Sequence, residues 1–574
     1  MKLTKLIFLS LAVAACVGCS YEPVDTFVES QDPNPLTQEQ VDAWAKVGEG
    51  LNASWADPDV RHSRSTVPAN LVDGGYKLTL WKGEKGGAMV MLWAAEAVDG
   101  VECKVGEFKS ADAVLPASVA QARFVRYTLS DEVLQSGRPK CLVPDMLDDL
   151  DRFDMAEQTA RPVWITVSVP QDAASGVYKT SVTLTHNGRG KVILPLEVEV
   201  VDHVLPEPAK WNYHLDLWQH PTAVARINGL QCWSDAHFEA LRPQMELLAA
   251  AGQKVITANL NKDPWNHQCY DAYDNMIKWV KMADGNWVYD YTVFDRWVEF
   301  MLGLGINKMI NCYSMLPWNC ELEYLDEIKA EKVTVVAEPG TPIFTEMWTP
   351  FLKDFKKHLE QKGWLNITNI AMDERSPETM QIAADLLEKI APEMGFALAD
   401  NHESYKKFTM MRDVCLFQRQ ELDPKDLELR RSRGQNTTFY ICCAPPYPNT
   451  FTSSDPYEAE LLGWYGVAKD FDGMLRWAYN SWPENPIMDS SFGNWPAGDT
   501  YFTYPGARSS IRFERLIEGI QAAEKVRILR KKGVDVSELD KAFEKLLSLD
   551  INDPKQPWHE ITNELEAIMA KVSR

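Results

Sequence analysis

Apolar and polar positions alternate in short stretches between about residues 70 and 202. Such alternation is typical of strands with one buried face, and Gly, Pro, Asn and Asp separate the stretches. Asn187-Gly188 has the composition of a hairpin turn, and only 39–53 has a helical period. The strand-like stretches are 78–81, 88–93, 124–129, 163–169, 178–185 and 192–200. They predict an antiparallel β-sandwich over 20–205, with a leading stalk.

The pattern changes at about residue 211, where strands begin to alternate with amphipathic segments. Two of these segments have clear helix starts, Ser376 before Pro377 and Asp423 before Pro424. The expected strands are 212–218, 254–260, 308–314, 367–373, 396–401, 413–418, 437–443 and 473–480. Eight strands, each followed by a helix, predict an α/β domain that is a (β/α)₈ TIM barrel over 206–534, with a doubly wound sheet as the alternative. Further helices over 535–574 are expected to pack on the barrel.

Three connections in this region are long, namely 261–290, 314–343 and 481–509. In a barrel each of them follows a strand, so all three open at the C-terminal face where active sites form. They carry the aromatic residues Trp265, Trp318, Trp482, Trp495 and Tyr501. The sequence therefore predicts a cleft built by loops at that face.

Residues 1–19 have the pattern of an export signal, with Lys2 and Lys5 before a short apolar segment. Small residues then precede Cys16 and Cys19, and either cysteine fits a lipoprotein cleavage site. An ordinary signal peptide is the alternative. No later stretch has the 18 or so apolar residues of a membrane span. We expect a protein of the bacterial cell envelope, periplasmic or outer-surface, whose only membrane contact is a lipid anchor.

Charge and cysteine usage exclude several classes of function. The formal net charge is −23, which argues against a nucleic-acid partner because such binding depends on clustered Lys and Arg. Neither a zinc spacing nor a nucleotide fingerprint occurs, so no metal and no cofactor are expected. Nine cysteines follow the signal, and they are expected as single thiols, with a Cys312–Cys320 disulfide as the alternative. Cys442 and Cys443, in one strand, are expected to point to opposite faces.

The adjacent carboxylates of Asp373 and Glu374 carry the chemistry. They lie at the end of the fourth predicted barrel strand, just before the helix that Ser376 caps. Acidic residues near a helix start are also common without catalysis, because they favour the helix dipole. At a barrel strand end, however, the pair suits hydrolysis in which the 2-acetamido group of the substrate is the nucleophile. One carboxylate then orients that group and the other acts as general acid and base.

Several segments, in this order, resemble glycoside hydrolase family 123. They are 161–178, 216–221, 372–375 (MetAspGluArg), 476–483, 498–506 and 510–520. The resemblance implies a β-sandwich joined to a catalytic (β/α)₈ barrel and β-N-acetylgalactosaminidase activity. It implies that Asp373 orients and stabilises the acetamido group and that Glu374 is the general acid/base.

Other polar and aromatic residues near predicted strand ends are candidates for sugar contacts, each with a structural alternative. Arg512 and Arg515 are expected at a helix surface or in structural salt bridges. The candidate contacts are Trp218, His220, Tyr313, Asn401, Trp477, Tyr479, Trp482 and Asp499.

The sequence thus predicts a retaining exo-β-N-acetylgalactosaminidase that releases terminal β-linked GalNAc from a glycan through an oxazolinium intermediate. A β-N-acetylglucosaminidase and a non-catalytic glycan-binding lipoprotein are the alternatives. The sequence leaves the natural glycan and the oligomeric state open.

Overall fold

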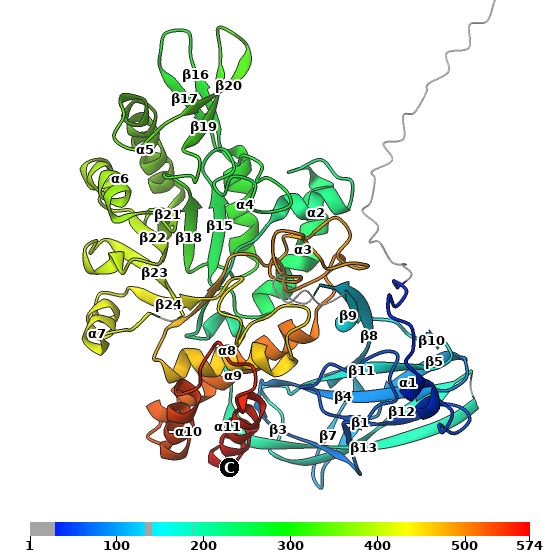
Figure 1. Ribbon diagram of the computed structural model, residues 1–574. Coiled ribbons are helices and arrows are strands. Elements are labelled where there is room, and N and C mark those ends of the chain that lie inside the picture. Colours follow the sequence, from blue (N-terminus) through cyan, green and yellow to red (C-terminus); the bar gives the residue numbers. More distant parts are fainter. Residues whose placement is uncertain (1–28, 132–139, 188, 419) are drawn as a thin grey trace, which may run out of the picture.

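The computed structural model describes residues 29–131, 140–187, 189–418 and 420–574 (Figure 1). The predicted signal peptide with Cys16 and Cys19, and the start of the stalk, lie outside the described residues. A β-sheet domain comes first and a parallel barrel follows it. Two helices, α10 (Ser537–Leu547) and α11 (Trp558–Val572), end the chain and share the hydrophobic core of the barrel. None of the described helices is long and apolar enough to cross a bilayer.

Two sheets form the N-terminal domain, as predicted. In the first, the strand order is β2 (Leu71–Val72), β1 (Asn52–Ala56), β4 (Lys85–Ala94), β11 (Thr159–Ser168), β8 (Ala120–Ser130) and β9 (Cys141–Asp148). In the second it is β10 (Phe153–Met155), β5 (Val98–Val105), β12 (Gly176–His186), β13 (Arg189–Val204) and β3 (Tyr76–Lys82), with β6 (Phe108–Lys109) and β7 (Val114–Leu115) beside this path. All pairs are antiparallel except β3 with β13, a parallel pair that the sequence did not predict.

Alternation along β4 explains how this domain packs. Val90 lies in the core between the two sheets, whereas its neighbours Met89 and Met91 lie in a second cluster with Ile511 of α9 (Ile511–Lys531). Both faces of the strand are therefore apolar, because a barrel helix covers the outer one. Asn187, with φ +45°, lies in the turn between β12 and β13. The helical segment near the start is shorter than predicted, α1 (Gln38–Trp44).

Eight parallel strands form the barrel, so the doubly wound alternative is wrong. Along the chain they are β14 (His214–Leu217), β15 (Val255–Asn259), β18 (Met309–Tyr313), β21 (Thr368–Asp373), β22 (Gly395–Asp400), β23 (Met411–Phe417), β24 (Asn436–Tyr440) and β25 (Gly473–Arg476). β25 pairs with β14, and a bridge between Leu215 and Gln253 connects β14 to the segment that leads into β15. This order closes the ring.

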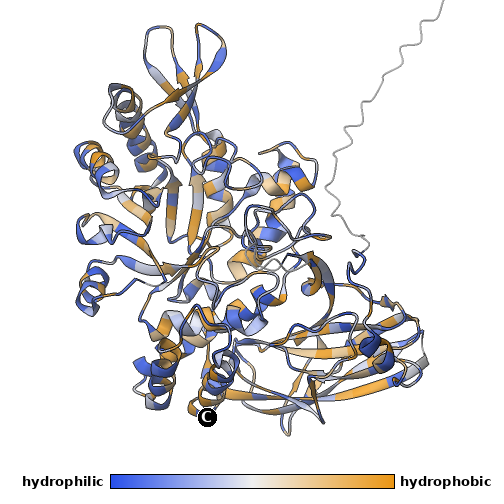
Figure 2. Ribbon diagram, viewed as in Figure 1, coloured by the Kyte–Doolittle hydropathy of each residue, from blue (hydrophilic) through white to orange (hydrophobic). Residues whose placement is uncertain are grey.

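Helices surround the barrel, with polar and apolar bands along them (Figure 2). They are α2 (Pro221–Ile227), α3 (Asp235–Ala250), α4 (Thr292–Gly303), α5 (Pro342–Lys362), α6 (Pro377–Ile390), α7 (Pro424–Ser432), α8 (Pro456–Ala468) and α9. The prediction that every strand is followed by an α-helix is wrong at β22, which only the 3₁₀ turn Ser404–Lys406 follows. This connection spans 401–410, and a helical crossover between parallel strands needs a longer segment.

Two of the long loops contain a small sheet that the sequence did not predict. Its strand order is β17 (Trp287–Asp290), β16 (Lys278–Lys281), β19 (Glu321–Asp326) and β20 (Glu331–Val336). The sheet projects beyond the barrel on the side away from the sandwich (Figure 1). The loops after β15 and β18 therefore support each other.

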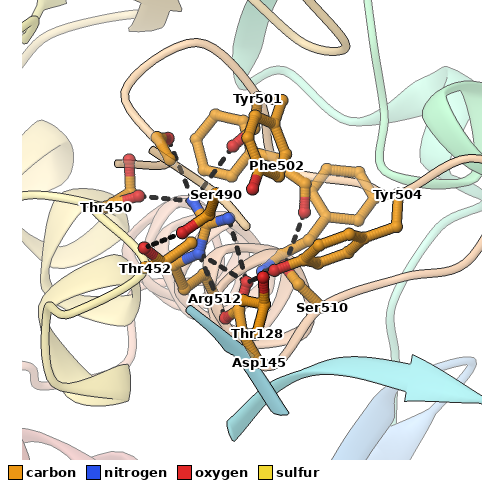
Figure 3. Close-up of polar contacts among 12 residues, drawn as sticks. Thr128, Asp145, Thr450, Thr452, Ser490, Tyr501, Phe502, Tyr504, Ser510 and Arg512 are labelled. Atoms are coloured by element: carbon orange, nitrogen blue, oxygen red, sulfur yellow. Dashed lines mark hydrogen bonds and ion pairs between the residues drawn. The ribbon is translucent and has the colours of Figure 1, made fainter. Parts of the chain in front are cut away.

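A buried ion pair joins the sandwich to the barrel (Figure 3). Arg512 of α9 donates from Nε to both carboxylate oxygens of Asp145 on β9, at 3.1 and 3.0 Å. Tyr504 donates to the same carboxylate at 2.8 Å. Arg515, also buried, pairs with Asp59 at 2.7 Å. The structural salt bridges predicted for both arginines are confirmed, and the surface alternative is wrong.

We expect Arg512→Met to lower the free energy of unfolding by about 3–5 kcal/mol, because it leaves the Asp145 carboxylate buried without its main partner. Urea denaturation followed by tryptophan fluorescence measures this as a lower midpoint. Arg530→Met, on the same helix but in an exposed pair with Asp540, is the matched control and should cost about 0–1 kcal/mol. Equal midpoints for the two variants would contradict the structural role of Arg512.

Candidate active site

Asp373 and Glu374 end β21 and begin the turn into α6. The backbone of Glu374 is left-handed, with φ +46°, and its N–H donates to the carbonyl of Ala399 on β22 at 2.9 Å. Consecutive strand residues point to opposite faces, and this turn breaks that alternation, so both carboxylates line one pocket. The side chain of Ser376 accepts from the N–H of Thr379 and starts α6, as its sequence predicted.

The pocket has a volume of about 200 Å³. It opens at the C-terminal ends of the barrel strands, where the sequence placed the cleft. Strand ends supply Trp218, Ala399, Tyr440 and Leu475, while long loops supply Trp318 and Trp495. The other lining residues are Gln268, Asp373, Glu374, Cys442, Cys443, Trp477 and Asp499. Aromatic rings and carboxylates thus share one small hollow, a combination typical of sites that bind small polar ligands.

Asp373 has its pKa close to neutral pH. Burial, followed by the negative charge of Glu374, raises the pKa of Asp373 to about 7. The indole N–H groups of Trp318 and Trp265 act in the opposite direction. A further hydrogen-bond donor placed against Asp373 by a ligand would favour its ionised form.

Tyr440, the last residue of β24, donates its hydroxyl to Oε1 of Glu374 at 2.5 Å. Burial and the hydrogen bond to Glu374 raise the pKa of Tyr440, so the hydroxyl stays protonated and remains a donor. Sequence reasoning missed this residue. The available signal was a tyrosine inside the predicted strand 437–443, close to the catalytic face.

Aromatic rings form one wall of the pocket. Trp218 lies 4.9 Å from Trp265 and 4.7 Å from Tyr313, measured between ring centroids. Trp477 meets Trp495 edge to face at 5.4 Å. Such faces suit the C–H groups of a sugar ring. The ring of Tyr313 contacts Trp218 and Trp265, but Tyr313 is not among the residues that line the pocket.

Asp499 lies in the pocket wall, paired with a buried arginine. Arg476 donates to Asp499 Oδ1 at 2.5 Å and to Asn449 Oδ1 at 2.9 Å. Burial raises the pKa of Asp499 to about 6, against the opposing charge of Arg476. The carboxyl is therefore mostly ionised at pH 7 and can accept a hydrogen bond from a sugar hydroxyl.

Comparison with known proteins identifies the family to which the chain belongs. The model of the glycoside hydrolase 123 catalytic domain matches residues 218–529, and that of the glycoside hydrolase 123 N-terminal domain matches residues 55–186. The chain belongs to glycoside hydrolase family 123. It is therefore a glycoside hydrolase, and the resemblance seen in the sequence is confirmed.

Solved structures agree with this assignment. A family 123 glycoside hydrolase from Clostridium perfringens, whose structural analysis addressed glycolipid glycan hydrolysis, is similar with a TM-score of 0.83 and 25% identity. The match covers 91% of this chain and 98% of that chain. A Bacteroides ovatus GH5 xyloglucanase reaches a TM-score of 0.30 at 10% identity, over 77% of this chain and 98% of that chain, and carries no argument. No curated protein matches.

Besides Tyr313, four candidate contacts of this family 123 hydrolase lie outside the pocket lining. The ring of His220 contacts the carbonyl of Trp477 at 3.2 Å, and burial lowers its pKa to about 4, so it is neutral. Tyr479 donates to the carbonyl of Gln244, and Trp482 to that of Thr503. Asn401 is exposed in the turn after β22. The first three are held by backbone carbonyls in the core, which is the structural alternative considered for them.

The structure also tests the predictions about disulfide bonding and about the orientation of Cys442 and Cys443. Cys312 and Cys320 are both free thiols, so the disulfide considered between them is absent. Cys442 and Cys443 do not point to opposite faces. Because β24 ends at Tyr440, strand alternation no longer applies, and both cysteines line the pocket with their sulfurs 4.0 Å apart.

One group of described residues in this hydrolase has the spacing of a cation site, Asp57, Asp59 and His559. It is separate from the residues that line the pocket. Arg515 already pairs with Asp59 at 2.7 Å, and Asp59 raises the pKa of His559 and so favours its charged form. The group is better described as part of an ion-pair network than as a metal centre.

Proposed function

We propose that this hydrolase is a retaining exo-β-N-acetylgalactosaminidase that uses the 2-acetamido group of its substrate as nucleophile. The observation that carries the proposal is the placement of Asp373 and Glu374, consecutive residues that line one small pocket. An enzyme nucleophile and its acid normally come from opposite sides of the sugar. Two carboxyls from one strand end instead suit substrate assistance, with one carboxyl for the acetamido group and one for the leaving oxygen.

In the first step the carbonyl oxygen of the acetamido group attacks C1 of the sugar. The bond between C1 and the glycosidic oxygen breaks, and Glu374 gives its proton to that oxygen. Asp373 accepts a hydrogen bond from the acetamido N–H and stabilises the positive charge of the oxazolinium ring that forms. In the second step Glu374 removes a proton from water, water attacks C1, and the ring reopens with net retention of configuration.

The two carboxyls have different roles in this scheme. The acetamido N–H and the indole N–H groups of Trp318 and Trp265 all favour the ionised form of Asp373. Asp373 therefore serves as the carboxylate, and the scheme assigns the acid to Glu374. The hydroxyl of Tyr440 holds that carboxyl in place and donates to it again after the proton has left.

Pocket size and lining support exo action on an amino sugar. About 200 Å³ is less than the roughly 300–1,000 Å³ of typical ligand sites, so it suits one sugar ring. Trp218 and Trp477 offer aromatic faces, and Asp499 offers an acceptor for a hydroxyl. The preference for GalNAc rests on the family resemblance. The Clostridium relative, studied for glycolipid glycan hydrolysis, makes a glycolipid a reasonable first natural substrate.

The testing experiment compares 4-nitrophenyl β-glycosides of GalNAc, GlcNAc and galactose with protein that lacks residues 1–19. We expect cleavage of the β-GalNAc substrate, slower cleavage of β-GlcNAc, and none of the galactoside, which has no acetamido group. Equal cleavage of the galactoside would overturn substrate assistance. Glycan binding without turnover at any pH would favour a binding protein instead.

The value of kcat/KM is expected to rise as the pH increases to about 7. The scheme needs Asp373 as a carboxylate, and burial and the charge of Glu374 raise the pKa of Asp373 to about 7. Each pH unit below that value then costs about tenfold in kcat/KM. Initial rates with the β-GalNAc substrate between about pH 5 and pH 9 measure this. Equal values of kcat/KM at pH 5 and pH 7 would contradict the need for an ionised Asp373.

We also propose that the mature protein is anchored in the bacterial envelope by lipid on Cys16 or Cys19. The motivation is the signal pattern of residues 1–19. Partition of cell extracts into detergent should place the wild type in the detergent phase. Only one of Cys16→Ala and Cys19→Ala should release it, and release by neither variant would contradict the anchor.

A further inference from the structure

We propose that Cys442 and Cys443 form a redox-active dithiol in the wall of the sugar pocket, and that its oxidation to a vicinal disulfide weakens substrate binding. Both residues line the pocket that contains Asp373 and Glu374. The effect on activity rests on the proposed function. The redox chemistry itself does not.

The two thiols are close and accessible. Their sulfurs lie 4.0 Å apart, in the segment that follows β24. Cys443 is exposed, and Cys442 is half-buried. The other seven cysteines of the described residues lie outside this pocket.

The environment makes the two sulfurs chemically unequal. The hydrogen bond between them lowers the pKa of Cys443 and, together with burial, raises that of Cys442. Burial and the charge of Asp499 oppose this lowering at Cys443, and Arg476 adds to it. Since the thiolate is the nucleophile, the exposed Cys443 is the attacking sulfur and Cys442 is the resolving one.

The reaction needs an oxidant, which we specify as a small disulfide such as oxidised glutathione. The Cys443 thiolate attacks one sulfur of that disulfide, forms a mixed disulfide and releases one thiolate. Cys442 then loses its proton and attacks the sulfur of Cys443, which forms the Cys442–Cys443 bond and releases a second thiolate. The protein loses two electrons and two protons in total, and one external disulfide becomes two thiols.

Ring closure must move the pocket wall. The sulfurs have to approach from 4.0 Å to about 2.05 Å. Adjacent Cα atoms are about 3.8 Å apart, closer than the roughly 4.4–6.8 Å of relaxed disulfides, so the bond is strained and readily reduced. A strained, exposed disulfide is the reversible kind.

A chain of hydrogen bonds connects this segment to the pocket carboxylate. Asn449 donates to the carbonyl of Cys442 at 2.9 Å and accepts from Arg476, which in turn holds Asp499. Movement of Cys442 therefore disturbs Asp499, whereas Tyr440, which holds Glu374, lies within β24 and before the segment that moves. We expect oxidation to raise KM by about 2- to 10-fold, the effect of losing about one net hydrogen bond, with kcat largely kept.

The experiment treats the folded protein with oxidised glutathione, then with dithiothreitol, and reads intact mass, peptide linkage and KM. The expected product lacks two hydrogen atoms, links Cys442 to Cys443 within one peptide, and has a raised KM that dithiothreitol restores. Cys443→Ser should lose both the mass change and the KM response. Cys232→Ser, which removes a half-exposed thiol outside the pocket, is the matched control and should keep both.

Each outcome decides the proposal. No linked peptide, or glutathione retained on a single cysteine, overturns the dithiol even if the protein has no activity on any tested glycoside. A linked peptide with unchanged KM overturns its effect on substrate binding. If every glycoside is inert, binding of GalNAc by calorimetry replaces KM, so failure of the proposed function remains distinguishable.

Discussion

Replacing Asp373 by asparagine is expected to lower kcat/KM for 4-nitrophenyl β-GalNAc by about 10²–10³, the usual cost of losing one preorganised electrostatic group. The substitution keeps the shape of the side chain and removes the negative charge that stabilises the oxazolinium ring. Because the loss affects attack by the acetamido oxygen, it should be similar for good and poor leaving groups. Steady-state rates with a series of aryl β-GalNAc substrates measure this.

A matched control is available on the helix that follows. Asp385 of α6 is exposed, and Asp385→Asn should retain the wild-type rate. If Asp373→Asn also kept that rate, Asp373 would have no part in the reaction. If its loss grew steeply with poorer leaving groups, Asp373 would be the acid, and the two roles would be exchanged.

Unlike Asp373→Asn, Glu374→Gln should lose activity to an extent that depends on the leaving group. With an alkyl β-GalNAc substrate we expect a loss of about 10²–10⁴ in kcat/KM, because the departing oxygen needs a proton. With 2,4-dinitrophenyl β-GalNAc the rate of the bond-breaking step should be nearly unchanged, since that leaving group departs without a proton. Added azide should then give the β-glycosyl azide, because the missing general base no longer limits attack on C1. A uniform loss across leaving groups would contradict the role of Glu374.

Tyr440→Phe serves as a comparison for this variant. It removes the hydroxyl that donates to Glu374 but leaves the carboxyl intact. Loss of one hydrogen bond to a charged group costs about 1.5–3 kcal/mol, so the expected decrease is about 10- to 150-fold on the alkyl substrate. A larger effect than that of Glu374→Gln would mean that the tyrosine, rather than the glutamate, transfers the proton.

Local patterns predicted the position of the carboxyl pair because local physics determines it. The apolar run before Asp373, together with Ser376 and Pro377 after it, marks both the strand end and the helix start. The barrel then brings every strand end to one face, so the location of the pocket follows from the fold class. The interior residues of the sandwich follow in the same way from alternation along β11, whereas β4 is apolar on both faces.

Positions next to strand ends were less predictable, because distant partners decide which way a side chain faces. Tyr479 donates to Gln244 and Trp482 to Thr503, contacts that no local period encodes. The prediction that Cys442 and Cys443 point to opposite faces was wrong for another reason. The predicted strand extended to residue 443, whereas β24 ends at Tyr440, and two extra residues were enough to misplace both thiols. The same error hid Tyr440, which was expected inside the strand and in fact ends it.

The central claim is that the N-acyl oxygen of the substrate is the nucleophile. The most direct test varies the strength of that nucleophile. It measures kcat/KM for 4-nitrophenyl β-galactosaminides whose N-acyl group is acetyl, fluoroacetyl, difluoroacetyl or trifluoroacetyl. Each fluorine weakens the carbonyl oxygen as a nucleophile while changing the size of the group little. Substrate assistance through Asp373 and Glu374 predicts a steep stepwise fall in kcat/KM along the series. A flat series would contradict it and point to a nucleophile supplied by the enzyme.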